Sequence, residues 1–153
     1  MMPKNTLSVG DKIPSFELLN QHGELIRISP DDGIKRIIYF YPKDNTKVCT
    51  EQACSFEEWQ EDFAQKGFQV IGISSDSVHK HVDFSEKYNL TFELLSDVDG
   101  KVRKQFGAAS FFGLIPMRIT FVVDESGTII YFFDALMEGE EHVNKVFEFL
   151  KKV

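Results

Sequence analysis

Two cysteines, Cys49 and Cys54, lie five residues apart near the start of a predicted helix. The residues before the first cysteine follow the pattern Pro42-x-x-x-Thr46-x-x-Cys49, so a proline and a hydroxyl precede the thiol. In the first turn of a helix, free backbone N–H groups and the positive end of the helix dipole favour a thiolate over a thiol. We therefore expect Cys49 to be ionised at neutral pH and to act as a nucleophile, rather than to pack as a small hydrophobe.

Cys54 is not predicted to share a helix face with Cys49. Five residues of an ideal helix leave the two side chains about 140° apart, with a rise of about 7.5 Å. The Cα atoms are then about 8 to 9 Å apart, beyond the limit of about 7 Å for a disulfide without backbone movement. A static disulfide is disfavoured, and a transient one requires the helix start to unwind. The C-x-x-x-x-C spacing is also unusual for zinc ligands, and no nearby histidine pair completes such a site.

The elements that must position these cysteines alternate between strands and helices. Two segments with alternating polarity, 15–19 and 24–29, flank a turn-like stretch and predict an N-terminal hairpin. The continuous apolar run at 36–41 predicts a central strand covered on both faces. Further strands are expected at 69–74, 92–95, 119–123 and 128–133. Four helices are expected: one from Cys49 to about Lys66, one that follows the caps at 75–77 and runs to about Tyr88, a short one that follows the turn at 97–100 and runs to Phe106, and one at 141–152.

This order predicts an α/β domain with a thioredoxin-like fold, in which a mixed central sheet carries helices on both faces. The N-terminal hairpin and a second hairpin at 119–133 explain why the sheet is not purely parallel. Residues 107–116 are expected to form a loop. Because the chain has 153 residues and no linker-like or repeated segment, we expect one domain over residues 1–153.

The charge of the chain limits its partners. There are 17 Lys and Arg residues against 24 Asp and Glu residues, which gives a net charge of −7. A field of this sign repels phosphate backbones and anionic lipid, so neither nucleic acid nor a membrane is expected as a partner. The sequence has no long apolar run and no signal-peptide pattern at its start, which predicts a cytoplasmic protein.

The segment YFYPKDNTKVCTEQACSFEE at 39–58 resembles the peroxiredoxins, and within them the peroxiredoxin Q or bacterioferritin comigratory protein type. Supporting resemblances lie in SVGDKIPSFEL at 8–18, YNLTFELLSDVDGKV at 88–102 and RITFVVDESG at 118–127, so the likeness covers essentially the full chain. A second cysteine five residues after the first is typical of this type. One departure is Lys47-Val48, where the subfamily more often has Pro-Gly. The larger side chains are expected to change access to the pocket or the ease with which the helix start unwinds.

The resemblance implies a thioredoxin-dependent peroxidase that reduces hydrogen peroxide or organic hydroperoxides without metal, haem or flavin. By the same resemblance, Cys49 is the peroxidatic cysteine and Cys54 resolves its sulfenic acid as an intramolecular disulfide. Thr46 then holds the peroxide by its hydroxyl, Pro42 shields the sulfur, and Arg118 is the active-site arginine. Thioredoxin or a similar dithiol is the implied reductant, and the implied oligomeric state is a monomer, with a dimer as the alternative.

Two other functions remain open at the level of the sequence, because one fold supports many activities. The chain could be a thioredoxin-like disulfide exchanger or a non-catalytic binding domain. Thr46 and Arg118 together with Cys49 favour the peroxidase, because dithiol exchange needs no hydroxyl to hold a peroxide. Arg103 is a lesser candidate for the active-site arginine.

A second pattern, the H-x-H of His79 and His81, falls on the predicted helix that follows residue 77. Two positions along a helix separate side chains by about 200°, so these two rings cannot converge on one ligand. We interpret both histidines as solvated surface residues.

Overall fold

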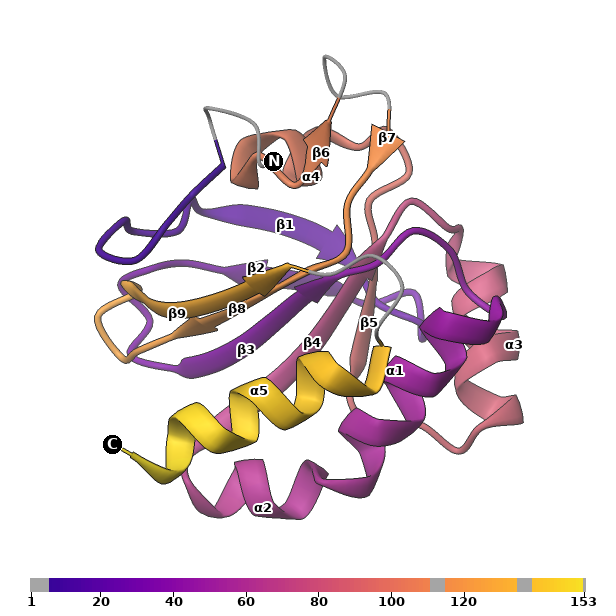
Figure 1. The fold of residues 1–153 in the computed structure, drawn as a ribbon. Helices are drawn as coiled ribbons and strands as arrows, with labels where there is room; N and C mark the ends of the chain where they lie inside the picture. Colours follow the sequence, from indigo (N-terminus) through magenta and orange to yellow (C-terminus); the bar gives the residue numbers. More distant parts are fainter. Residues whose placement is uncertain (1–5, 111–114, 135–138, 153) are drawn as a thin grey trace.

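The computed structural model of the chain describes residues 6–110, 115–134 and 139–152. Within these residues seven strands form one sheet, shown edge to edge across the centre of Figure 1. In spatial order the strands are β2 (Leu25–Ile28), β1 (Phe16–Leu19), β5 (Glu93–Ser96), β4 (Phe68–Ser74), β3 (Lys35–Phe40), β8 (Ile119–Val123) and β9 (Ile129–Asp134). The strands β3, β4 and β5 are parallel, while β1–β2, β1–β5, β3–β8 and β8–β9 are antiparallel pairs. The mixed sheet and both predicted hairpins are confirmed.

Helices cover both faces of this sheet. The helices α1 (Lys47–Glu58), α2 (Gln60–Gln65) and α5 (Gly139–Lys151) lie below the sheet in Figure 1, with α3 (Val78–Lys87) at the right. All four contribute buried residues to one cluster on this face of the sheet. The short helix α4 (Lys101–Phe106) lies on the other side, where Val102 and Phe106 join a second buried cluster. The predicted arrangement of helices on both faces is therefore confirmed.

The strand β3 separates the two buried clusters, as its apolar run predicts. Ile37 and Tyr39 belong to the cluster under α1 and α5, whereas Ile38 and Phe40 belong to the cluster under α4. Alternate residues of a strand point to opposite faces of the sheet. Because helices cover both faces, all four side chains are buried. The end of β3 thus leads directly from the core of the sheet to the cysteine helix.

Two predicted elements differ from the structure. The helix expected from Cys49 to Lys66 is interrupted at Trp59, whose φ of −100° and ψ of 8° end α1 before α2 begins. No glycine or proline marks this break; the Trp59 ring packs 4.7 Å from that of Phe147 on α5. The expected loop at 107–116 contains two short strands, β6 (Ala109–Ser110) and β7 (Ile115–Pro116), which pair antiparallel. Residues 111–114 of that segment lie outside the described part of the chain.

Candidate active site

Cys49 is the third residue of α1, so its thiol lies in the first turn of a helix as predicted. The chain leaves β3 at Phe40 and enters α1 at Lys47, with Thr46 as the N-cap residue in an extended conformation. The Cys49 side chain is 1% exposed. A sulfur at this place is surrounded by the free N–H groups of the helix start, which favour a negative charge there.

Arg118 lies in direct contact with Cys49, although 69 residues separate them in the sequence. Its Nη2 donates to the Cys49 Sγ at 3.1 Å, and its Nη1 donates to Oε1 of Gln52 at 2.5 Å. The β3–β8 ladder causes this proximity, because Phe40 pairs with Ile119 and the residues beyond both ends therefore meet. A buried guanidinium against the sulfur stabilises a thiolate, and Gln52 holds the guanidinium in its orientation.

Thr46 precedes Cys49 by three residues, a spacing that places side chains on one side of a helix start. Its hydroxyl makes no capping bond to α1 but donates to the carbonyl of Lys43 at 3.1 Å. Because this bond occupies the hydroxyl proton, the lone pairs of the Thr46 Oγ1 can accept a hydrogen bond from another group. Thr46 is an exposed residue. Pro42 is half-buried at the start of the same loop.

Cys54 is exposed as the eighth residue of α1, and both cysteines are free thiols. Since α1 is a continuous helix over both residues, the separation of about 8 to 9 Å between their Cα atoms holds and no disulfide is compatible with this state. Partial burial raises the pKa of Cys54, and the carboxylate of Glu57 raises it further. The two cysteines therefore differ, because one faces a cation and the other faces an anion.

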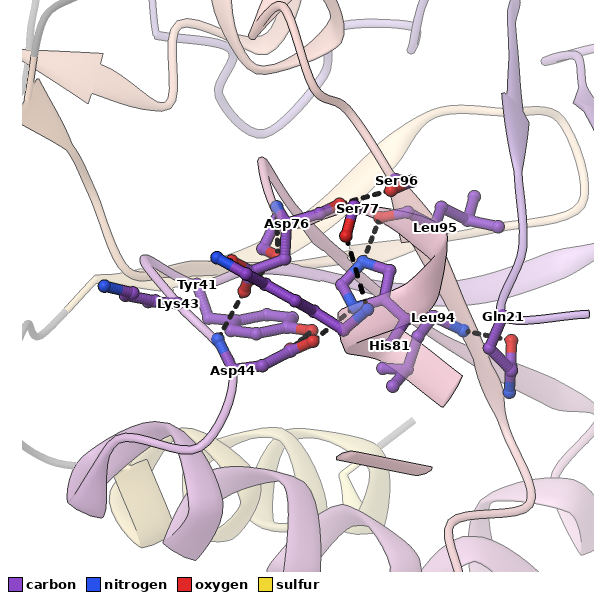
Figure 2. Close-up of polar contacts among 12 residues, drawn as sticks. Gln21, Tyr41, Lys43, Asp44, Asp76, Ser77, His81, Leu94, Leu95 and Ser96 are labelled. Carbon is purple, nitrogen blue, oxygen red and sulfur yellow. Dashed lines mark hydrogen bonds and ion pairs between the residues drawn. The ribbon is translucent and has the colours of Figure 1, made fainter. Parts of the chain in front are cut away.

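The loop between β3 and α1 is held by a buried polar network centred on Asp44 (Figure 2). Its carboxylate accepts the Tyr41 hydroxyl and lies 2.5 Å from Nδ1 of His81, while its N–H donates to Oδ2 of Asp76 at 2.5 Å. The other ring nitrogen of His81, Nε2, lies 3.0 Å from the carbonyl of Leu95. Each ring nitrogen faces an acceptor group, so we expect both to carry protons and His81 to pair as an imidazolium with the Asp44 carboxylate.

The interpretation of His81 as a surface residue is therefore wrong, whereas that of His79 is correct. The His81 side chain is 0% exposed, because it lies with Phe84 on the face of α3 that packs inward. The His79 side chain is 86% exposed and contacts Asp83 across one helical turn at 3.6 Å. Sequence reasoning also missed Asp44 and Gln52, although the three-residue spacing of Gln52 from Cys49 is a signal for contact with the same group.

Two further findings concern the described residues as a whole. They bring together no group of three or more His, Cys, Asp or Glu side chains suited to a metal ion. They also include no helix with both the length and the apolar character needed to cross a membrane.

The fold and these contacts define a class of protein, an α/β domain with an arginine-paired cysteine at the start of a helix. A family model described as the AhpC/TSA family matches residues 9–132. The chloroplastic peroxiredoxin Q of Oryza sativa subsp. japonica is 39% identical over 148 residues, covering 96% of this chain and 68% of that protein. The crystal structure of peroxidoxin BcpB from Mycobacterium tuberculosis matches with a TM-score of 0.88 at 32% identity, over 96% of this chain and 98% of that one. A peroxiredoxin Q variant from Xanthomonas campestris matches with a TM-score of 0.81 at 28% identity, over 90% of each chain.

The chain therefore belongs to the AhpC/TSA family and, within it, to the peroxiredoxins of the Q type. It is a thiol peroxidase that reduces peroxides through cysteine chemistry. The resemblance seen in residues 39–58 and the thioredoxin-like fold expected from it are both confirmed.

Proposed function

We propose that Cys49 is the peroxidatic cysteine and that thioredoxin or a similar dithiol is the final reductant. The observation that carries this proposal is the 3.1 Å contact from Arg118 Nη2 to the Cys49 Sγ. A permanently charged guanidinium against a buried sulfur at a helix start is the environment in which a thiol becomes a nucleophilic thiolate. A binding domain has no need for such a pair.

In the first step the thiolate attacks one oxygen of the peroxide, in line with the O–O bond. An S–O bond forms, the O–O bond breaks, and the second oxygen takes up a proton and leaves as water or an alcohol. Arg118 and the N–H of Cys49 donate toward the oxygens as negative charge develops on them. The Thr46 Oγ1, whose own proton is directed to Lys43, accepts the O–H of the hydroperoxide, while Pro42 shields the sulfur.

In the second step Cys54 condenses with the sulfenic acid of Cys49, releasing water and forming an intramolecular disulfide. The first turns of α1 must unwind for this step, because the intact helix holds the two cysteines apart. The external dithiol then reduces the disulfide by thiol–disulfide exchange. Lys47-Val48 lies in the segment that unwinds, where Pro-Gly is more usual for the subfamily.

We extend the proposal to substrate, assembly and compartment. Hydrogen peroxide and organic hydroperoxides are the proposed substrates; the bacterioferritin comigratory protein of Xanthomonas campestris, 27% identical to this chain, has alkyl peroxide reduction activity. We propose a monomer formed by one domain over residues 1–153, acting in a reducing compartment such as the cytoplasm, where thiols stay reduced. The similar peroxiredoxin Q of Oryza sativa subsp. japonica is chloroplastic, so the chloroplast is the alternative compartment.

Stopped-flow mixing of the reduced protein with hydrogen peroxide tests the assignment of the two cysteines. Trp59 lies where α1 ends, so its fluorescence is expected to report the state of that helix. Cys49→Ser is expected to abolish the first turnover. Cys54→Ser is expected to consume one equivalent of peroxide normally and to lose sustained turnover with thioredoxin, while Ser55→Ala serves as the neighbouring control.

A retained burst in Cys49→Ser contradicts the nucleophile assignment, and full multiple turnover in Cys54→Ser contradicts the resolving role. Disulfide exchange with a protein substrate in the absence of any reaction with peroxide favours the disulfide exchanger instead. Sedimentation of the reduced protein as a dimer contradicts the proposed monomer.

A further inference from the structure

Arg103 is a second buried arginine near the ends of the strands that lead to the active site. It lies on α4, across the sheet from α1, and is 3% exposed. Among the described residues its guanidinium donates only to main-chain carbonyls. The distances are 2.6 Å from Nη2 to the oxygen of Tyr41, and 2.9 Å and 3.2 Å from Nη1 to those of Met117 and Ala108.

These carbonyls belong to the two segments that supply the catalytic groups. Tyr41 directly precedes Pro42 at the end of β3, and Met117 directly precedes Arg118 at the start of β8. The third carbonyl, that of Ala108, also accepts the N–H of Met117 at 3.0 Å. One planar guanidinium therefore joins the start of the Cys49 loop to the residue before the arginine that contacts Cys49.

The surroundings of Arg103 are costly for a cation. Burial lowers the pKa of Arg103 to about 10, although the nearby charges of Asp97 and Cys49 act to raise it. Its Nε has no hydrogen-bond partner among the described residues. The Asp97 carboxylate accepts the backbone N–H groups of Val102 and Arg103 and makes no ion pair with the guanidinium. The guanidinium is therefore held by three carbonyls and by the Phe40 ring, 5.5 Å from its central carbon, rather than by a counter-ion, which ties it to the two segments beside Cys49.

We propose that Arg103 is a positioning residue for peroxide reduction, which sets the place of Arg118 relative to Cys49 by binding the carbonyls of Tyr41 and Met117. Lysine cannot replace it fully, because an ammonium lacks the planar fork that binds several carbonyls in fixed directions. The inference rests on the proposed roles of Cys49 and Arg118.

The test compares Arg103→Met and Arg103→Lys with the wild type and with Arg27→Met. Arg27 is an exposed residue of β2 that contacts Glu17 on β1, so its variant controls for the loss of an arginine. Two quantities are measured against pH: the rate constant of the first turnover with hydrogen peroxide, and the ultraviolet absorbance of the Cys49 thiolate. A Cys54→Ser background keeps the thiolate signal and the reaction confined to Cys49.

For Arg103→Met we expect a rate constant about 10- to 100-fold below wild type, even at the pH where Cys49 is fully ionised, because small misplacements of catalytic groups have effects of this size. Arg103→Lys is expected to keep a plateau rate below that of the wild type, and Arg27→Met is expected to leave the plateau rate unchanged.

A wild-type plateau rate in Arg103→Lys overturns the proposal, and this variant decides the question if Arg103→Met does not fold. A lower melting temperature with an unchanged plateau rate in Arg103→Met overturns it as well, because that is the result of a merely structural role. An Arg118→Met variant that reacts like wild type would instead contradict the proposed roles of Cys49 and Arg118. The two failures are therefore distinguishable.

Discussion

The buried pair of His81 and Asp44 leads to a prediction whose size follows from the structure. His81→Phe keeps an aromatic ring beside Tyr41 but removes both ring N–H donors, so the Asp44 carboxylate stays buried with the Tyr41 hydroxyl as its remaining side-chain donor. Removing one partner of a buried ion pair costs about 3 to 5 kcal/mol. The carbonyl of Leu95 also loses its donor, which adds about 1 kcal/mol. We expect His81→Phe to lower the free energy of unfolding by about 4 to 6 kcal/mol.

His79→Phe is the matched control, because the same substitution is made two residues away on the exposed face of α3. It is expected to change the free energy of unfolding by less than about 0.5 kcal/mol. Urea unfolding followed by Trp59 fluorescence measures both variants. The double variant Asp44→Asn with His81→Phe should lose less than the sum of the single losses, by about 1 to 3 kcal/mol, because no uncompensated carboxylate remains.

Nitrogen-15 spectra of the His81 ring at neutral pH test the protonation state on which this reasoning depends. Two protonated ring nitrogens are expected, since each faces an acceptor. A single ring proton, or a His81→Phe variant as stable as His79→Phe, would refute the argument that an ionised pair holds the loop between β3 and α1.

Three further predictions concern other groups. Tyr39→Phe is expected to keep or raise stability by up to about 1 kcal/mol in urea unfolding, because the buried Tyr39 hydroxyl has no partner among the described residues; a loss of stability contradicts this. Burial acts to raise the pKa of Asp124, but hydrogen bonds within its hairpin turn outweigh burial and lower this pKa. The ionised Asp124 therefore stabilises the folded protein at pH values above the pKa of the unfolded chain, about 3.9. This contribution to the free energy of unfolding is lost as the pH falls through the pKa of the folded protein. Asp124→Asn should therefore show a smaller loss of stability on acidification than wild type, and an equal loss argues against the turn as the cause. Burial and the Glu57 carboxylate raise the pKa of Cys54, so the rate of disulfide formation should increase with rising pH when it is measured by quenched-flow mass spectrometry. Glu57→Gln should shift this pH profile to lower pH, and an unchanged profile contradicts the role of Glu57.

The parts of the site that sequence reasoning located depend on local chemistry. Cys49 falls in the first turn of α1 because a polar cap and an apolar helical period follow a strand-like run. The hairpins at β1–β2 and β8–β9 follow from alternation and turn residues in the same way. Arg118 was located by family resemblance, and the structure explains its place by the β3–β8 register.

The parts that were missed depend on contacts between distant elements. His81 lies in a helix whose polarity alone does not reveal that Asp44 and Leu95 face it from two other segments. Arg103 binds backbone carbonyls, and a carbonyl carries no side-chain signature that a sequence could display. The break at Trp59 likewise coincides with a contact to Phe147 on α5, nearly 90 residues later, rather than with any helix-breaking residue.

The structure also shows why the two chemical steps make opposite demands on α1. The folded first turn keeps Cys49 against Arg118, and Gln52, between the two cysteines, holds the same guanidinium. Unwinding that brings Cys54 to the sulfur must therefore release Arg118 from Gln52. It must also separate Val48 from Gly139 of α5, where a Cβ on the glycine would lie only 2.4 Å from the Val48 carbonyl. Contacts that stabilise the first turn of α1 consequently favour the reaction with peroxide and oppose resolution by Cys54. The contact of α5 is with Val48 and not with Arg118, so variants in α5 should change the rate of disulfide formation more than the rate of the reaction with peroxide.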